Sequence, residues 1–143
     1  MWYNRIMIGL LSSPLHIFVS KNMLLVNYTG RKSGQAYRVP VNYLPDGELL
    51  YTTSQLSRVW WRNLRDGQPV TLRLRGQNVQ AVPQVVEEPQ AVKRHFKRYF
   101  ELQPRLARYF DVGLEHGQPK DEDLRRCAQG RVMVVFEVQG NMG

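Results

Sequence analysis

Short apolar runs and alternating stretches, rather than long helical patterns, dominate the first two thirds of the chain. Runs of this kind, bounded by turn residues, are typical of β-strands. Pro45, Asp46 and Gly47 form a turn signal that predicts a hairpin. Pro83 predicts an edge strand or a bulge, because proline cannot donate to a sheet ladder. The expected strands span Met23–Tyr28, Tyr37–Leu44, Glu48–Ser54, Val70–Arg75, Val79–Val86 and Arg131–Val138.

Helical spacing becomes prominent only after Glu88. There, Val92, Phe96, Tyr99 and Phe100 fall on one stripe, which is typical of a helix that packs one face on a core. Pro104 interrupts this pattern. The further helical segments that the pattern predicts are 2–11, Arg58–Arg65, 105–110 and Asp121–Cys127.

About six strands with helices inserted late predict an α+β domain: a closed or split antiparallel β-barrel with helices packed outside. The length of 143 residues fits a single domain, 1–143. We expect an N-terminal helix and lead-in at 1–20, barrel strands within 23–86 and 131–138, and a helical insertion at 88–128. The final apolar strand is expected at the centre of the sheet, since an exposed one would promote aggregation.

The net charge of +8 is concentrated in the first half of the chain, where residues 1–76 carry ten basic and three acidic residues. This asymmetry indicates an anionic partner, which could be nucleic acid, a membrane surface or a ligand with phosphate or carboxylate groups. The single cysteine, Cys127, excludes an internal disulfide and fits a reducing cytoplasm. The three histidines are scattered and no cysteine–histidine spacing predicts a metal site.

The N-terminal segment MWYNRIMIGLLSSPLHIFVSK raises the question of a targeting or membrane element. Its apolar stretch is too short for a transmembrane helix, and no small-x-small cleavage pattern follows it. We therefore expect a cytoplasmic protein. The alternative is peripheral membrane association, with Trp2, Ile6 and Leu10 on one side of the helix.

Candidate chemistry begins in the segment TGRKSGQAYRVP, residues 29–40. Gly30 and Gly34 allow backbone conformations that bring peptide N–H groups close to a ligand. Arg31 offers a planar fork and Lys32 a mobile point charge, a combination that binds phosphate or carboxylate. The alternative is an ordinary solvated hairpin loop. Neutral donors of the same loop are Ser33 and Gln35.

A second cluster, VWWRNLRDGQP, spans residues 59–69. Adjacent Trp60 and Trp61 on a helical turn point about 100° apart, so we expect one in the core and the other elsewhere. With Arg62 and Asn63 at its edge, an aromatic wall suits a flat heteroaromatic ring or a nucleic-acid base. The alternative is a core tryptophan beside a partly exposed one.

Tyr99 and Tyr109, in the helical region, could position or protonate a substrate, although tyrosines at helical spacing are commonly packing residues. The chain has no Walker A loop, GxGxxG, HExxH or GxSxG motif. If the protein is an enzyme, a cofactor is therefore expected to supply the reactive group.

The order of these motifs resembles that of the deazaflavin-dependent nitroreductase family, among the split β-barrel flavin and deazaflavin oxidoreductases. The likeness covers about residues 23–138 and depends mainly on GRKSGQ followed by WWRNLR. It implies a split barrel related to pyridoxamine-phosphate oxidase-like domains. It also implies coenzyme F-420, whose tail carries phosphate and glutamate, with FMN, heme or another ligand as the alternative. The segment SQLSRVWW, residues 54–61, is shorter than in many members.

The resemblance also implies roles for particular residues. The loop would grip the anionic part of the cofactor, the following strand would pass under its ring, and the tryptophan segment would support the pocket. The cofactor-binding residues implied are Arg31, Lys32, Ser33, Gly34, Gln35, Arg38, Val39, Pro40, Val41, Thr53, Ser54, Gln55, Trp60, Trp61 and Asn63. The catalytic candidates are Tyr109, Tyr99 and Ser54.

The implied reaction is hydride transfer from reduced coenzyme F-420 to a quinone, a nitro compound or another conjugated acceptor, a small-molecule substrate. The alternatives are a split-barrel protein for FMN or another ligand, or a non-catalytic module for anionic metabolites or nucleic acid. Nucleic acid is not expected, because no DNA- or RNA-binding signature is present and acidic residues dilute the basic helix at 93–98. A monomer and a homodimer are equally compatible with the resemblance.

Overall fold

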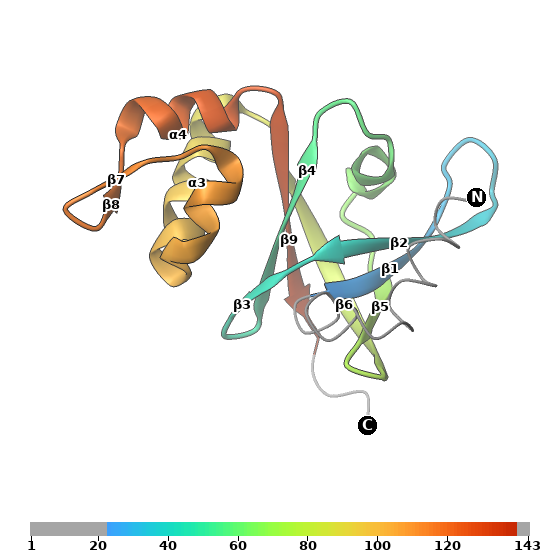
Figure 1. Ribbon diagram of the computed structural model, residues 1–143. Helices are drawn as coiled ribbons and strands as arrows, with labels where there is room; N and C mark the ends of the chain where they lie inside the picture. Colours follow the sequence, from blue (N-terminus) through green and yellow to red (C-terminus); the bar gives the residue numbers. More distant parts are fainter. Residues whose placement is uncertain (1–22, 140–143) are drawn as a thin grey trace.

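The structure is a computed structural model that describes residues 23–139 of the chain. Its described part contains one large antiparallel sheet with the strand order β2-β1-β5-β6-β9-β4-β3 (Figure 1). The predicted helix at 2–11 and its lead-in lie outside the described residues. The strands of this sheet are β1 (Met23–Thr29), β2 (Ala36–Asn42), β3 (Leu44–Asp46), β4 (Leu49–Gln55), β5 (Val70–Leu74), β6 (Gln77–Val86) and β9 (Arg131–Val138).

The two edges of this sheet are nearly continuous in the chain. The edge strands β2 and β3 are separated only by Tyr43, which is buried. The first part of this bent segment pairs with β1, where Leu25 lies opposite Pro40. The second part pairs with β4, where Leu44 lies opposite Tyr51. The sheet therefore curls into a barrel that is split along one side, which confirms the predicted fold class.

Each predicted strand has a counterpart in the structure, with shifts of a few residues at the ends. β9 lies between β6 and β4, which confirms its predicted central position. The prediction of an edge strand at Pro83 is wrong for β6 as a whole, because β6 lies between β5 and β9. The pairing with β5 nevertheless ends at Ala81, so Pro83 is paired only with β9, opposite Phe136. A missing N–H is tolerated where one side of the strand has no partner.

The barrel interior is filled by alternate residues of the strands. Leu72 and Phe136 are fully buried there, together with Leu24 and Val26. The short 3-10 helix η2 (Trp60–Leu64), within the predicted helical segment, contributes both of its tryptophans to this core. Burial of large apolar side chains is the main stabilising contribution to such a core.

A helical layer covers the outer face of β4 and β9 (Figure 1). The helix α3 (Pro89–Leu102) begins at Glu88, whose carboxylate accepts hydrogen bonds from two backbone N–H groups of the first turn at 3.0 and 2.9 Å. This is a capping arrangement that satisfies otherwise unpaired donors. The predicted apolar stripe of α3 is buried against Met133 and Val135 of β9. The remaining elements are η3 (Pro104–Phe110), the unpredicted hairpin of β7 (Leu114–Glu115) and β8 (Gln118–Pro119), and α4 (Asp121–Ala128).

Within 23–139, no helix combines the length and the apolar character needed to cross a membrane. The same part of the chain contains no group of three or more His, Cys, Asp or Glu side chains placed to hold a metal ion.

Candidate functional site

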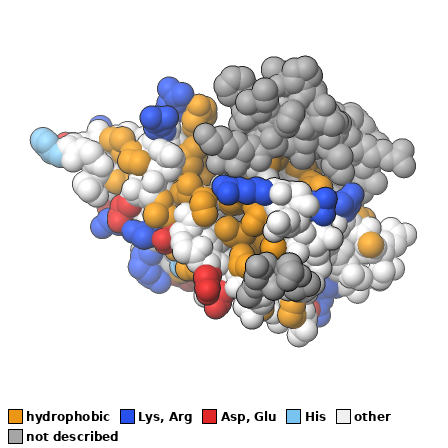
Figure 2. All heavy atoms as spheres, turned by 90° about the horizontal axis from the view of Figure 1, so that it is seen from below, with side chains coloured by type: hydrophobic (Ala, Val, Ile, Leu, Met, Phe, Trp, Pro, Cys, Tyr) orange, Lys and Arg blue, Asp and Glu red, His pale blue; other side chains and the backbone are white. Residues whose placement is uncertain are grey.

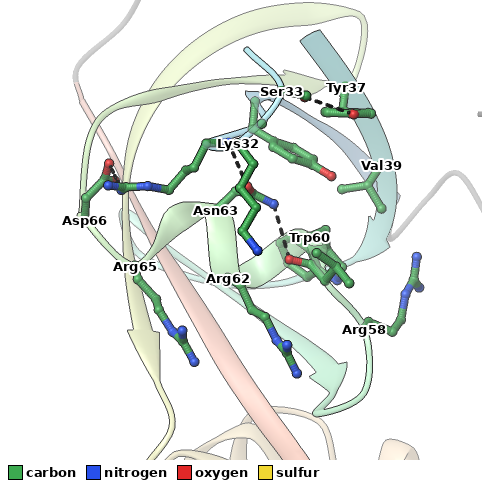
Figure 3. Close-up of a pocket in the computed structure, with 14 residues that line it drawn as sticks. Lys32, Ser33, Tyr37, Val39, Arg58, Trp60, Arg62, Asn63, Arg65 and Asp66 are labelled. Carbon is green, nitrogen blue, oxygen red and sulfur yellow. Dashed lines mark hydrogen bonds and ion pairs between the residues drawn. The ribbon is translucent and has the colours of Figure 1, made fainter. Parts of the chain in front are cut away.

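A cleft of about 1230 Å³ opens between the loop that joins β1 to β2 and the 3-10 helix η2 (Figure 3). The two segments that the sequence analysis singled out therefore face the same space. The lining residues are Tyr28, Gly30, Arg31, Lys32, Ser33, Tyr37, Val39, Arg58, Val59, Trp60, Arg62, Asn63, Arg65 and Asp66.

The loop at residues 30–35 has a defined backbone conformation. The N–H of Gly30 donates to the carbonyl of Gln35 at 2.8 Å, and the N–H of Gly34 donates to the carbonyl of Gly30 at 2.9 Å. Gly34 has a φ of 70°, which favours glycine. At Gly30, an added Cβ would lie 2.7 Å from both Ser33 Oγ and Tyr37 Cε2, so a side chain does not fit. Gly30 is therefore required by close packing within the loop, and Gly34 is favoured by its backbone conformation.

Polar and aromatic contacts hold the base of the loop. The hydroxyls of Ser33 and Tyr37 are hydrogen-bonded at 3.2 Å, and Tyr37 donates to Gln35 Oε1 at 3.2 Å. The rings of Tyr28 and Tyr37 are stacked with centroids 5.5 Å apart. The sequence analysis missed both tyrosines as cleft residues. The signal was present in the hairpin pairing, because Tyr28 and Tyr37 lie opposite each other on either side of the loop.

Asn63 and Asp66 tie the loop to η2. The backbone N–H of Arg31 donates to Asn63 Oδ1 at 3.0 Å, and Asn63 Nδ2 donates to the carbonyl of Val59 at 3.3 Å. The guanidinium of Arg31 forms an ion pair with Asp66. Arg31 is therefore both part of the loop and a link to the opposite wall of the cleft.

The two tryptophans of η2 have different roles. Both are buried, so the prediction that one of them lies outside the core is wrong. Trp60 lines the cleft and its Nε1 donates to Ser54 Oγ at 3.1 Å. Trp61 lies in the core, with the guanidinium groups of Arg62 and Arg65 at 5.3 and 4.9 Å from its ring centroid. Those two guanidinium groups therefore pack over the Trp61 ring.

The charge of the cleft lining is strongly positive, with five basic residues and one carboxylate, Asp66. Arg65 is neutralised by Glu87, which accepts two hydrogen bonds at 2.8 and 3.0 Å and raises the pKa of the guanidinium. Lys32 forms no hydrogen bond or ion pair with any residue of the described part. Figure 3 shows Arg62 and Arg65 extending from η2 away from Ser33. A cleft with this excess of cations fits a polyanionic ligand.

Several predicted residues come together in this cleft. Arg31, Lys32, Ser33, Val39, Trp60 and Asn63 line it. Other predicted residues do not line it. Arg38 donates to Asn27 Oδ1 at 3.0 Å, and Ser54 serves as the acceptor for Trp60. Gln55 lines a second, smaller cleft. The remaining predicted residues outside the cleft lining are Gly34, Gln35, Pro40, Val41, Thr53 and Trp61.

The two catalytic tyrosine candidates lie apart from the cleft lining. Tyr99 is buried in the helical layer among Phe96, Phe100 and Phe110, and burial raises its pKa to about 12. Tyr109 is 67% exposed, and its hydroxyl accepts a hydrogen bond from Arg108 at 2.9 Å. We therefore leave both tyrosines out of the candidate site.

Solved structures with a similar fold come from several proteins. A FAD-binding protein from Mesorhizobium loti has a TM-score of 0.54 and 14% identity over 90% of this chain and 91% of its own. A conserved hypothetical protein from Mycobacterium tuberculosis has a TM-score of 0.52 and 17% identity over 90% and 81%. An F-420 reductase has a TM-score of 0.49 and 18% identity over 83% and 87%. These likenesses show that the chain has a split-barrel fold.

The family follows from the sequence itself. The sequence profile of the F-420H(2)-dependent quinone reductases matches residues 12–113, so the chain belongs to this family. That match confirms the resemblance drawn from GRKSGQ and WWRNLR, both of which lie inside the matched range. A search of curated proteins gives no match.

Proposed function

We propose that this oxidoreductase transfers a hydride from reduced coenzyme F-420 to a quinone, a nitro compound or another conjugated acceptor bound in the cleft. Membership of the family supports the general reaction. The observation that carries the choice of cofactor is the cleft itself, in which Lys32, a cation with no partner among residues 23–139, lies on the loop opposite Trp60.

The donor set of the cleft fits the two chemically different ends of such a cofactor. Lys32 would hold the anionic tail, since a lysine ammonium binds phosphate as a mobile point charge. Val59, which is 62% exposed, together with Trp60 in the cleft wall, gives an apolar surface that suits a flat ring. When bound, reduced coenzyme F-420 supplies the hydride. The same anionic-tail and flat-ring criteria are met by FMN, which is the alternative cofactor.

The residues of this chain have three tasks in the proposed reaction. The loop and η2 orient the cofactor, and the tie through Asn63 keeps the two walls at a fixed separation. The indole and valine surfaces exclude water from the reacting rings. The hydroxyl oxygens of Ser33 and Tyr37 would accept hydrogen bonds from polar groups in the cleft, since their O–H groups donate within the loop. Reduction of a quinone also consumes a proton, which we assign to solvent at the open mouth.

Three further expectations stay predictions. The protein is expected in the cytoplasm and without a nucleic-acid partner. On the face shown in Figure 2, Lys and Arg side chains form separate groups among hydrophobic ones, rather than one continuous basic surface.

The oligomeric state, monomer or homodimer, can be measured by light scattering. One solved neighbour, with a TM-score of 0.52 and 16% identity, is described as a domain-swapped dimer.

The test is equilibrium binding of coenzyme F-420 and of FMN to the purified protein, followed by the absorbance and fluorescence of each cofactor. We expect micromolar or tighter binding of the deazaflavin. The double variant Arg31→Ala/Lys32→Ala should raise its Kd at least about tenfold, since a charge-assisted contact contributes roughly 1.5–3 kcal/mol before screening. The melting temperature should change little, because both side chains belong to an exposed loop.

A matched control removes the same two charges elsewhere. Arg94 and Lys97 are exposed on α3, outside the cleft lining. The double variant Arg94→Ala/Lys97→Ala should leave the Kd within about twofold, since the two charges lie outside the cleft. A folded sample that binds neither cofactor, or a loop variant that loses stability instead of affinity, would refute the proposal.

A further inference from the structure

A second cleft, of about 470 Å³, lies beside the first one. It is formed where β4 ends, where the connection to η2 begins and where β9 starts. Arg62 lines both clefts and therefore marks the boundary between them. The other lining residues are Gln55, Leu56, Ser57, Gly130 and Arg131.

The chemistry of this second cleft is cationic without any compensating carboxylate in its lining. Neither Arg62 nor Arg131 forms an ion pair within residues 23–139. The lining also offers the amide of Gln55 and the hydroxyl of Ser57. Two guanidinium groups with no acidic partner attract an anion.

Contacts on the protein side hold both guanidinium groups in place. Arg131 donates through Nη1 to the carbonyl of Cys127 at 3.2 Å, and its guanidinium lies 5.2 Å from the ring centroid of Phe110. Arg62 donates through Nη2 to the carbonyl of Leu56 at 3.2 Å and lies over Trp61. A guanidinium has five N–H donors, so each arginine keeps donors for a ligand. Groups held in this way lose little freedom on binding.

The same cleft contains an apolar surface for a ring. Leu56 is 44% exposed although it is a large hydrophobic residue. Val59, which is 62% exposed, lines the adjoining first cleft. Exposed hydrophobic side chains beside a concave site are a common feature of ligand-binding surfaces. A flat ring that packs against Leu56 would share the cleft with the guanidinium groups of Arg62 and Arg131.

We propose that this second cleft is the subsite of the electron acceptor, and that Arg62 and Arg131 favour conjugated acceptors with a fixed anionic group, such as a sulfonate or carboxylate. The inference rests on the proposed function, because the acceptor has to lie beside the cofactor cleft and Arg62 joins the two. The substrate class is then an anionic quinone or a related acidic conjugated compound.

The experiment compares naphthoquinone sulfonate with unsubstituted naphthoquinone as acceptors for reduced coenzyme F-420. Ser57→Asp adds a negative charge to the second cleft at an exposed position, and Arg131→Gln removes a positive one. Each variant should lower the kcat/KM ratio of the sulfonate to the neutral quinone about tenfold, as expected for one charge-assisted contact. Coenzyme affinity should stay within about twofold in Ser57→Asp, since Ser57 lies outside the first cleft lining.

The matched control for Arg131→Gln is Arg125→Gln, on the exposed surface of α4 and outside both cleft linings. It should leave the acceptor ratio unchanged. A fall of the same size for both quinones in Ser57→Asp would overturn the charge preference. Unchanged kcat/KM values for both quinones in a folded Ser57→Asp variant would overturn the subsite.

A second readout does not depend on turnover. Calorimetric titration of naphthoquinone sulfonate into the protein without coenzyme should give binding that weakens in Ser57→Asp and with rising salt. If the wild-type protein binds the sulfonate in this way but never reacts with reduced coenzyme F-420, the proposed function fails while the anion subsite stands. If coenzyme turnover is observed and the sulfonate does not bind, the subsite fails alone.

Discussion

The backbone N–H of Arg31 and the side-chain carbonyl of Asn63 are hydrogen-bonded at 3.0 Å, although the two residues are 32 positions apart in the chain. This bond joins the cationic loop directly to η2. Because Asn63 also donates to the carbonyl of Val59, one side-chain amide bridges both walls of the cleft. The separation of the walls, and with it the space for a cofactor, depends on this amide.

We therefore expect Asn63→Ala to weaken coenzyme binding more than it weakens the fold. Loss of the bridge should raise the Kd for coenzyme F-420 by roughly 5- to 20-fold, because the two walls are no longer held at the separation that fits the cofactor. The free energy of unfolding should fall by less than about 1 kcal/mol, since both bonds are exposed to solvent. Fluorescence titration and urea unfolding measure the two quantities.

Asn78→Ala is the control for this variant. Asn78 accepts a hydrogen bond from Arg73 at 3.2 Å across the β5–β6 hairpin and lies outside the cleft lining. Its replacement should leave the Kd unchanged. If Asn63→Ala and Asn78→Ala bind the coenzyme equally well, the amide bridge has no role in shaping the cleft.

Ser54 is expected to act on stability rather than on chemistry. Its hydroxyl is the acceptor for the indole N–H of Trp60, and both residues are buried. Ser54→Ala would leave that N–H without its partner in the core, which costs about 1–3 kcal/mol. Urea unfolding should show this loss, while kcat at saturating coenzyme stays within about twofold, because the site retains its donors.

Ser57→Ala provides the comparison, since Ser57 is exposed and lies just beyond the end of β4, in the connection to η2. Its free energy of unfolding should stay within about 0.5 kcal/mol of the wild type. A large fall in kcat for a stably folded Ser54→Ala protein would instead return Ser54 to the catalytic candidates.

Features encoded by local periodicity were predictable from the sequence. Alternation marked the strands, and the stripe of Val92, Phe96 and Tyr99 marked the buried face of α3. The prediction for the tryptophan pair was wrong because the angle between adjacent helical residues fixes where each indole points. It does not show which other parts of the protein pack against each indole. In this fold η2 is held between the barrel core and arginine side chains, so both indoles are buried.

Contacts between segments that are distant in the chain could not be predicted from the sequence. The ion pair of Arg31 with Asp66 spans 35 positions, and no local pattern shows that these segments meet. The same limit explains why the prediction favoured Tyr99 and Tyr109, which stand out by helical spacing. Tyr28 and Tyr37, which line the cleft, become visible only once the hairpin register is known.

The buried thiol of Cys127 should make the fold sensitive to alkaline pH. Burial raises the pKa of this thiol from an ordinary 9.0 to about 11. A raised folded-state pKa means that the neutral thiol is favoured in the folded protein, so its contribution is complete below pH 9 and is lost as the pH rises toward 11. The loss should be of the order of 2 kcal/mol, because one pKa unit corresponds to about 1.4 kcal/mol. Tyr99, with a pKa raised to about 12, adds a similar loss at higher pH.

We expect Cys127→Ala to lower the free energy of unfolding by a constant amount below pH 9 and to flatten its decline between pH 9 and pH 11, as measured by urea unfolding. Because Cys127 is the single cysteine, a thiol reagent should react at neutral pH only when the protein unfolds. Equal pH slopes for the wild type and the variant, or rapid labelling of the folded protein, would contradict a buried thiol at this position.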